Sequence, residues 1–167
     1  AVGDGITDDT YSIQKAMDNC LTEYDNDDET SIILFPSSYT FYIYPIRLNK
    51  NNLHLWIDTN STLYISPNFT SGKWPKKSDN TSYINIIQNG QGKNLTNISI
   101  YGNGLINGNG QVWYPLVKNY EDDGRPHTIW IEYCQNVTIY NITILNSPAY
   151  NVYLHHNIDV IIYNINF

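Results

Sequence analysis

Residues 136–144 read NVTIYNITI, with apolar and polar side chains in alternation, which is the period of a half-buried strand. The pattern returns 23 positions later, at 159–167, as DVIIYNINF. It also stands 39 positions earlier, at 97–102, as NISIYG, and the next short run, LIN at 105–107, matches ILN at 144–146. The sequence pattern of one strand therefore recurs several times in the chain.

A further copy, NLHLW, lies another 45 positions back, at 52–56. Recurrence of this kind predicts a solenoid, in which each copy is one rung that cannot bury its apolar face alone. Strand-like rungs of this length predict an all-β chain folded as a parallel β-helix. The longer spacings predict inserted loops, which we place at 66–82 and 114–124, and we expect residues 1–167 to form one domain.

Composition narrows the possible functions. The chain is 41% hydrophobic and contains 15 Tyr and 4 Trp, which indicates a folded core. Its formal net charge of −7 argues against nucleic-acid binding, since that requires a basic face. No apolar run approaches the roughly 18 residues of a membrane helix, so we expect no membrane-spanning segment.

Residues 3–10 (GDGITDDT) precede a helical pattern that places four apolar side chains on one face: Ile13, Ala16, Met17 and Cys20. Thr7, Asp8 and Asp9 are candidates for capping the N-terminus of this helix. We expect the helix to cover the end of the solenoid. The acidic run within residues 22–31 is predicted to be a solvated loop.

Cysteine and histidine provide little evidence of a metal or disulfide. Cys20 and Cys134 lie far apart in sequence, nothing shows that they pair, and each is interpreted as a buried small apolar residue. The adjacent His155 and His156 should point to opposite faces of a strand, so no joint metal site is expected. No metal site and no cofactor are predicted.

Two stretches, one rich in glycine and one containing Trp74, each allow a ligand-binding and a structural interpretation. The segment 101–114 is punctuated by glycines, but a strand rather than a helix follows them, so tight turns explain them better than phosphate binding. In the loop 66–82, Trp74 and its neighbouring lysines could contact a ligand, or the loop could fold back on its own Trp.

Seven Asn-x-Ser/Thr sequences occur, at Asn60, Asn68, Asn80, Asn94, Asn97, Asn136 and Asn141. They favour a secreted, extracellular glycoprotein. The last four lie in the repeat, where Asn marks turns and Thr favours strands. Asn68 and Asn80 lie in loop-like sequence and are the predicted acceptors.

Several landmarks together resemble glycoside hydrolase family 28, the polygalacturonases and their relatives. They are, in chain order, GDGITDDT (3–10), LFP (34–36), PIRL (45–48), GLINGNGQVW (104–113), RP (125–126) and NSPAY (146–150). The resemblance covers nearly the whole chain. It implies a right-handed parallel β-helix that hydrolyses α-1,4 galacturonosyl bonds in pectin with inversion, using one carboxylic acid and carboxylates that activate water.

The chain departs from that family in its catalytic motifs. Asn-Thr-Asp, Asp-Asp in its family context, Gly-His-Gly and Arg-Ile-Lys are all missing. No catalytic residue is therefore assigned, and the resemblance places the catalytic rungs beyond Phe167, so that this chain looks like an N-terminal part that is inactive alone. The same resemblance marks Tyr150, Tyr153 and Arg125 as candidate substrate-binding residues, with Tyr where the family usually has Trp and His.

Three functions remain open at this point. The chain is part of a pectin-degrading hydrolase, a non-catalytic carbohydrate-binding or structural β-helix, or a lyase-type β-helix that uses Ca²⁺. The expected partner is a pectin-like polysaccharide, with Arg125, Lys118 and Lys73 as local basic groups for an acidic polymer. We also expect the uncovered last rung to promote self-association.

Overall fold

The computed structural model describes residues 1–20, 29–70, 72–76, 84–89, 94–116 and 124–167. Its strands wind into a right-handed parallel β-helix, and every strand pair within it is parallel. Right-handed crossovers are the hand expected for twisted parallel strands. The fold predicted from the repeat is confirmed.

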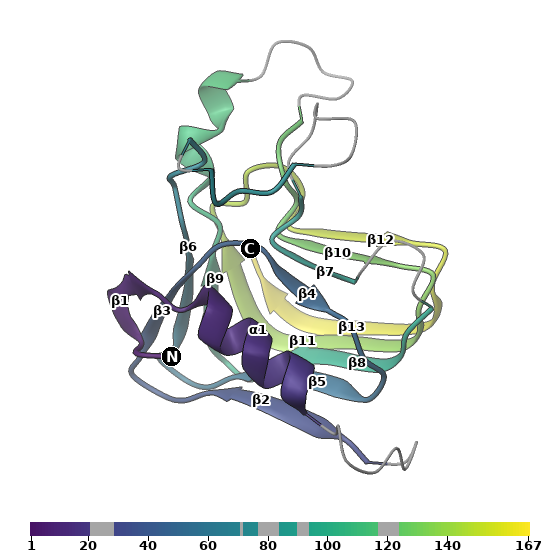
Figure 1. The fold of residues 1–167 in the computed structure, drawn as a ribbon. Coiled ribbons are helices and arrows are strands. Elements are labelled where there is room, and N and C mark those ends of the chain that lie inside the picture. Colours follow the sequence, from purple (N-terminus) through teal and green to yellow (C-terminus); the bar gives the residue numbers. More distant parts are fainter. Residues whose placement is uncertain (21–28, 71, 77–83, 90–93, 117–123) are drawn as a thin grey trace.

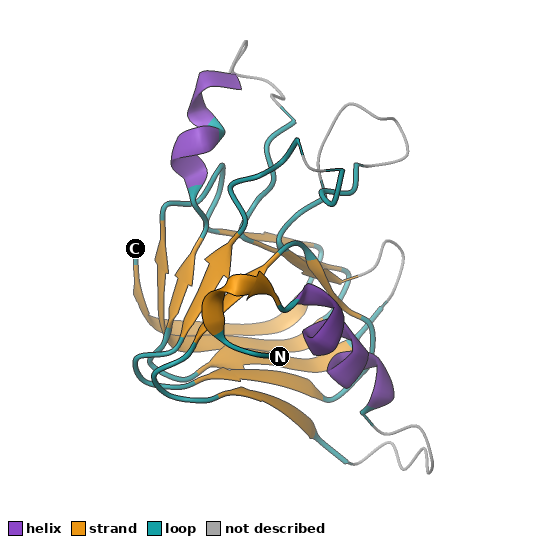
Figure 2. Ribbon diagram, turned by 60° about the vertical axis from the view of Figure 1, so that its left-hand side comes forward, coloured by secondary structure: helices purple, strands orange, loops and turns teal. Residues whose placement is uncertain are grey.

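The coil has three faces (Figures 1 and 2). The first consists of β2 (Ser31–Phe35), β5 (Leu53–Ile57), β8 (Thr96–Tyr101), the first half of β11 (Gln135–Leu145) and β13 (Ile158–Asn166). The second consists of β1 (Asp4–Asp8), β3 (Thr40–Ile43), β6 (Thr62–Ile65), β9 (Leu105–Asn107) and the second half of β11. Because β11 runs through both faces, they form one nine-stranded sheet.

The third face is a separate four-stranded sheet, which we call sheet B. It contains β4 (Ile46–Leu48), β7 (Ile87–Asn89), β10 (Ile129–Glu132) and β12 (Val152–His155). Two short 3-10 turns, η1 (Gly110–Val112) and η2 (Tyr114–Leu116), lie in the connection from β9 to β10. Both predicted loops thus fall between the second face and sheet B in chain order, and in Figure 1 their described parts leave the top of the coil.

The pairing register reproduces the sequence repeat. Leu55 pairs with Ile100, Ile100 with Ile139 and Ile139 with Ile162, which are the spacings of 45, 39 and 23 read from the sequence. The first three of these side chains are 0% exposed and form part of one apolar column. In β13 the column is uncovered, and Ile162 is 44% exposed.

One predicted match is wrong by a single residue. Leu105 pairs with Thr143 rather than Ile144, so Ile106 and Ile144 are the partners that point inward. The turn before β9 contains Gly102, Asn103 and Gly104, whereas β11 passes the same corner with one residue fewer. A shift of this pairing by one residue would have turned the inward apolar side chains to the outside, so burial of the core fixes the register.

Glycines in 101–114 serve close approach more than turn formation, which corrects the sequence interpretation. Gly102 does take a positive φ of 124°. At Gly110 the reason is different, since an added Cβ would lie 2.5 Å from the backbone oxygen of Ser147 in the next rung. The left-handed positions of this segment are instead occupied by Asn103 and Asn109.

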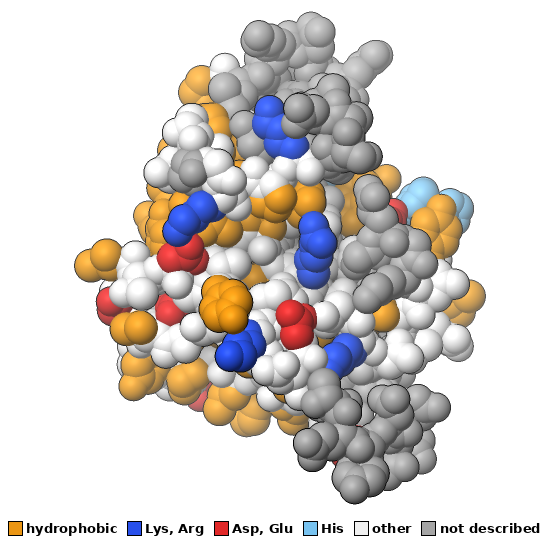
Figure 3. All heavy atoms as spheres, in the orientation of Figure 1, with side chains coloured by type: hydrophobic (Ala, Val, Ile, Leu, Met, Phe, Trp, Pro, Cys, Tyr) orange, Lys and Arg blue, Asp and Glu red, His pale blue; other side chains and the backbone are white. Residues whose placement is uncertain are grey.

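The helix α1 (Thr10–Asn19) covers the first rungs through Ile13 and Met17, which are 4% and 0% exposed. Ala16, expected on the same face, is exposed, because the buried stripe is only one residue per turn wide. Asp9 occupies the N-cap position but makes no side-chain cap; its buried carboxylate instead accepts hydrogen bonds from the backbone of Val2 and Gly3. Lys and Arg side chains lie on this face of the molecule, with Asp and Glu side chains among them (Figure 3).

Both cysteines are free thiols. Cys134 is 2% exposed, and burial raises the pKa of its thiol, as expected for an inert packing residue. Cys20 is only partly buried, so the prediction of a buried residue holds for Cys134 alone. Among the described helices, none has the length and apolarity that crossing a membrane requires.

Asparagines at the start of three first-face strands, β5, β8 and β11, form a hydrogen-bonded ladder. Asn52, Asn97 and Asn136 all take positive φ, at 54°, 57° and 56°. The Asn97 side-chain amide donates to Asn52 Oδ1 at 2.8 Å, and that of Asn136 donates to Asn97 Oδ1 at 3.5 Å. Asp159 takes the same left-handed conformation in the last rung, at φ 56°. The Asn residues of the repeat are therefore structural.

Two substitutions at Asn97 separate the backbone requirement from the side-chain hydrogen bonds. Asn97→Ala should lower the free energy of unfolding by about 1–3 kcal/mol, because alanine disfavours positive φ and cannot continue the ladder. Asn97→Gly loses the same hydrogen bonds but accepts the conformation, so it should be roughly 1 kcal/mol less damaging. Urea unfolding of the three proteins measures the difference. Equal losses in both variants would contradict a conformational role.

Candidate aromatic binding surface

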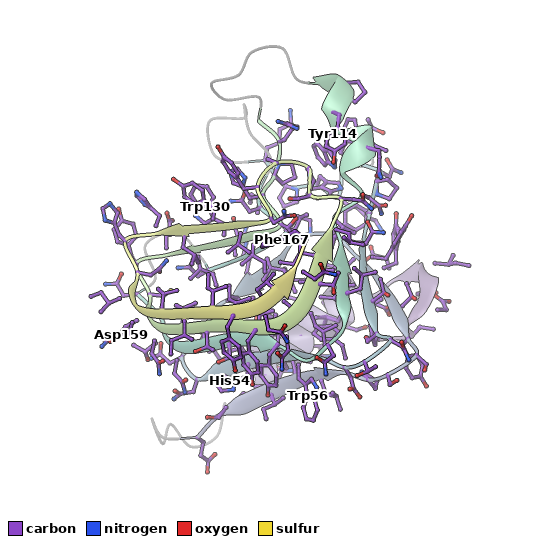
Figure 4. The ribbon with its side chains drawn as sticks, turned by 180° about the vertical axis from the view of Figure 1, so that it is seen from behind. His54, Trp56, Tyr114, Trp130, Asp159 and Phe167 are labelled. Carbon is purple, nitrogen blue, oxygen red and sulfur yellow. The ribbon has the colours of Figure 1, made fainter. Side chains whose placement is uncertain are left out.

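Aromatic side chains meet on the outer face of sheet B. Strands alternate, so Ile129 and Ile131 of β10 point into the core while Trp130 points outward. The register of β10 and β12 places Tyr153 beside Trp130. Their rings stack at a centroid distance of 4.1 Å and an interplanar angle of 11°. Figure 4 shows Trp130 on the side of the coil opposite His54 and Trp56.

Two residues that precede these strands extend the stack. The His127 ring lies 5.1 Å from Trp130 and 5.4 Å from Tyr153, nearly parallel to both. Tyr150 lies 5.1 Å from His127 and 6.1 Å from Tyr153. We call these four side chains the aromatic surface. Its outermost member is Tyr150, which is 63% exposed.

Hydrogen bonds hold the turn that carries Tyr150. The Tyr150 backbone N–H donates to His127 Nδ1 at 3.1 Å, so that nitrogen acts as an acceptor. The Tyr150 carbonyl accepts from the Ser147 hydroxyl at 2.7 Å and from the Thr128 N–H at 3.0 Å. The exposed ring is therefore attached to a backbone whose position is fixed from both sides.

Arg125 supports the same turn. One of its guanidinium N–H groups donates to the Pro148 carbonyl at 2.6 Å, and the side chain is partly buried. Of the three predicted substrate-binding residues, the structure thus brings Tyr150 and Tyr153 together in one surface and places Arg125 behind the turn that carries Tyr150. Whether any of them contacts a substrate stays a prediction.

The two inserted loops share a small apolar cluster beside this surface. Trp74 is 4% exposed, and its ring lies 4.9 Å from that of Trp113, which also packs against Phe69 at 4.7 Å. Trp74 therefore packs against the second loop, which excludes the ligand-contact interpretation for its ring. Tyr114, labelled in Figure 4, joins this loop to the candidate site by donating to the Ser147 carbonyl at 3.2 Å.

A second aromatic row on the first face has a different character. Tyr101, Tyr140 and Tyr163 stack across β8, β11 and β13 at 4.9 Å and 5.0 Å, with interplanar angles of 1° and 9°. The middle ring, that of Tyr140, has both faces covered by its neighbours. Burial first, and then the neighbouring Tyr101 and Tyr163, raise the pKa of Tyr140. This row stabilises the register and has no open ring face between its ends.

Neither Asp8 nor Asp9 fits the part of a general acid. Burial raises the pKa of Asp8, but hydrogen bonds from Lys73 and Thr10 outweigh it, so that its pKa lies below the usual value. Lys73 Nζ lies 2.8 Å from Asp8 Oδ2. The carboxylate of Asp9 is buried and holds the first backbone amides. A general acid needs a raised pKa, and these two residues have structural roles instead.

The histidine pair was misplaced by the sequence argument. The rings of His155 and His156 lie 4.0 Å apart, because His156 leaves the strand with a positive φ of 52°. His156 stacks on Tyr133 at 5.1 Å. Within the described part of the chain, no group of three or more His, Cys, Asp or Glu residues could hold a metal ion.

Some predicted features lie outside the described residues: Asn80, Lys118, and most of the acidic run within 22–31. Conversely, the sequence analysis missed His127 and Trp130 as members of the aromatic surface. Trp130 carries a usable signal, since it is the outward residue in the alternating run IWIE. His127 carries no such signal in the sequence, because its position in the surface depends on which turn packs against it.

The chain is thus a three-faced parallel β-helix that carries an aromatic surface on the outer side of sheet B. A family model, "Glycosyl hydrolases family 28", matches residues 46–167, and the chain belongs to that family. It is similar to a probable polygalacturonase of Vitis vinifera (26% identical over 98% of this chain and 34% of that protein). An endo-polygalacturonase of Pectobacterium parmentieri is 28% identical over 86% of this chain and 38% of its own length.

Solved structures show the same fold. An exopolygalacturonase of Thermotoga maritima superposes with a TM-score of 0.70 at 18% identity, covering 98% of this chain and 44% of that one. A polygalacturonase of Erwinia carotovora superposes with a TM-score of 0.68 at 23% identity, covering 96% and 51%. The chain spans about a third of the length of the curated relatives it matches.

Proposed function

We propose that this chain is part of a hydrolase that cleaves α-1,4 galacturonosyl bonds in pectin with inversion, and that the aromatic surface binds the polysaccharide. The observation that carries the second statement is the exposed Tyr150 ring above the Trp130–Tyr153 stack. Aromatic rings offer large apolar contact area at fixed geometry, which suits the C–H face of a sugar ring.

The 167-residue polypeptide is proposed to bind this polymer without cleaving it. Inversion needs an acid and a base roughly 6.5–9.5 Å apart. The sequence lacks the family's catalytic motifs, Asp8 is paired with Lys73, and Asp9 accepts hydrogen bonds from the backbone of Val2 and Gly3. A polypeptide that binds but does not hydrolyse would separate the positioning of the substrate from its chemistry.

Calorimetric titration with oligogalacturonate tests the binding proposal. Trp130→Ala removes the base of the stack and Tyr150→Ala removes its open ring, so each should weaken binding roughly tenfold, within the range of about 0.5–1.5 kcal/mol per aromatic contact. Tyr163→Ala, in the other aromatic row, is the matched control and should bind as the parent does. A reducing-end assay on the same samples should show no release of sugar.

Unchanged binding in both variants would overturn the aromatic surface as the binding site. Absence of any binding by the parent would favour a structural β-helix without a carbohydrate role. Release of reducing ends by the parent would contradict the proposed inactivity and direct the search to the described carboxylates.

We further propose that the exposed face of β13 causes the isolated polypeptide to self-associate. Ile158, Ile161 and Phe167 are 61%, 56% and 64% exposed on this strand and at its end. Such an apolar patch with open backbone hydrogen-bonding groups favours association. Ile161→Lys should shift sedimentation velocity profiles toward the monomer, whereas Thr138→Lys, one rung inward on the same row, should do so much less. A parent that sediments as a monomer at every concentration tested would contradict this proposal.

A secreted, glycosylated protein is also proposed. Asn68 is exposed, and its Oδ1 accepts a hydrogen bond from the Thr70 hydroxyl at 3.1 Å, within the Asn68-Phe69-Thr70 sequence. By contrast, Asn97 and Asn136 are bound in the ladder. Peptide mass spectrometry after expression in a glycosylating eukaryotic host should find glycan on Asn68 and none on Asn97. Glycan on Asn97 with Asn68 bare would contradict the assignment.

A further inference from the structure

A depression lies beside the N-terminal helix, away from the aromatic surface. Its volume is about 400 Å³, within the roughly 300–1,000 Å³ that small-molecule sites span. It is lined by residues of α1, of the strand connection before β4, and of the first inserted loop: Asp8, Thr10, Tyr11, Gln14, Tyr44, Pro45 and Lys73. We call it the cap pocket.

The cap pocket combines apolar rings with polar groups at its wall. Tyr11 is 76% exposed, which leaves most of its ring available to a ligand. Charged groups of opposite sign come from Asp8 and Lys73, since Lys73 Nζ lies 2.8 Å from Asp8 Oδ2. Lys73 Nζ also lies 5.5 Å from the centroid of the Tyr44 ring. A sugar acid is recognised by an aromatic ring that packs against the C–H face of the sugar and by charged groups that bind its hydroxyls or its carboxylate.

Short hydrogen bonds hold the wall in place. The Thr10 hydroxyl donates to Asp8 Oδ1 at 2.6 Å and accepts from the Tyr44 backbone N–H at 2.8 Å. The Gln14 amide bonds both backbone groups of Arg47, accepting from its N–H at 2.8 Å and donating to its carbonyl at 3.1 Å. These contacts join α1 to β4 and to the connection between β3 and β4, so the backbone of the wall needs little ordering when a ligand binds.

Beside the pocket stand two cations, Lys15 and Arg47, and the Asp18 carboxylate, which accepts a hydrogen bond from the Gln14 amide. In the described ranges, Lys73–Asp8 is the one ion pair, so Lys15 and Arg47 have no carboxylate partner there. Lys15 Nζ lies 5.9 Å from the ring of Tyr11, which lines the pocket, and Arg47 adjoins Gln14. Lys15 and Arg47 stand on a chain of formal net charge −7, on a face where Figure 3 shows Lys and Arg side chains with Asp and Glu side chains among them.

The cap pocket is separate from the aromatic surface. The outward row of sheet B runs from Arg47 through Gln88 to Trp130. Gln88 in the middle of the row is only 8% exposed, and Asn85 donates a hydrogen bond to its side-chain oxygen. The covered Gln88 interrupts the exposed surface, so a ligand at one end of the row does not automatically contact the other.

We propose that the cap pocket is a second binding site for uronic-acid units of an acidic polysaccharide, with Tyr11 as the stacking platform and Lys15, Arg47 and Lys73 as the anion-binding groups. The choice of a uronate polymer as ligand rests on the proposed function. A site at the cap would hold a second segment of the same polymer and raise its effective concentration at the aromatic surface.

Amide NMR spectra of the 167-residue polypeptide, titrated with oligogalacturonate, report on both sites separately. We expect shifts at the amides of Tyr11 and Gln14 that saturate, that weaken with added salt, and that are absent with a neutral galactose oligosaccharide of equal length. Tyr11→Ala should weaken this binding roughly tenfold while leaving the shifts at Tyr150 and Tyr153 unchanged. Because Tyr11 is largely exposed, the variant is expected to keep the parent spectrum elsewhere.

Each outcome has a distinct meaning. Shifts at Tyr150 and Tyr153 without shifts at Tyr11 and Gln14 would overturn the cap pocket and leave the proposed function intact. Shifts at the cap alone would support the cap pocket and count against the aromatic surface. Equal responses to the acidic and the neutral oligosaccharide would overturn the assignment to uronic acids. No shift at either place would overturn both proposals.

Discussion

Stacking of each rung on the one before it is the constraint on which the whole structure depends. Backbone hydrogen bonds join every strand to its counterpart in the neighbouring rung, and like side chains then fall in register, as in the column of Leu55, Ile100 and Ile139. The corners must turn the chain within a few residues, which is why Asn occupies left-handed positions there. The number of residues between two corners can change much from rung to rung only where an inserted loop leaves the coil.

The candidate sites follow from that constraint. Register alone brings Trp130 of one rung against Tyr153 of the next. The two inserted loops leave the coil at one corner, where Trp74 and Trp113 pack together and Tyr114 contacts the turn below Tyr150. A rigid coil thus supplies the spacing, and the loops supply the wall beside it. The cap pocket arises in the same way, from α1 packed against the first rungs.

Most of the coil could be predicted from the sequence because the repeat spacing is the pairing register. The exception at Leu105 arose because Gly102 and its neighbours lengthen one corner by a residue, which a repeat alignment without gaps does not detect. The aromatic surface was predicted only in part. Tyr150 and Tyr153 came from the resemblance, whereas His127 and the partners of Trp74 depend on contacts between segments far apart in sequence. Likewise, the rings of His155 and His156 meet only because His156 has positive φ.

The most direct test of this account is a crystal structure of the polypeptide with a bound oligogalacturonate. The account predicts a sugar ring lying against the exposed face of Tyr150, over the stack that Trp130 and Tyr153 form. Sugar bound instead across the row of Tyr101, Tyr140 and Tyr163, with the aromatic surface empty, would contradict it. That result would mean that the tyrosine row of the first face, and not the aromatic surface of sheet B, is the part of the fold that recognises the polymer.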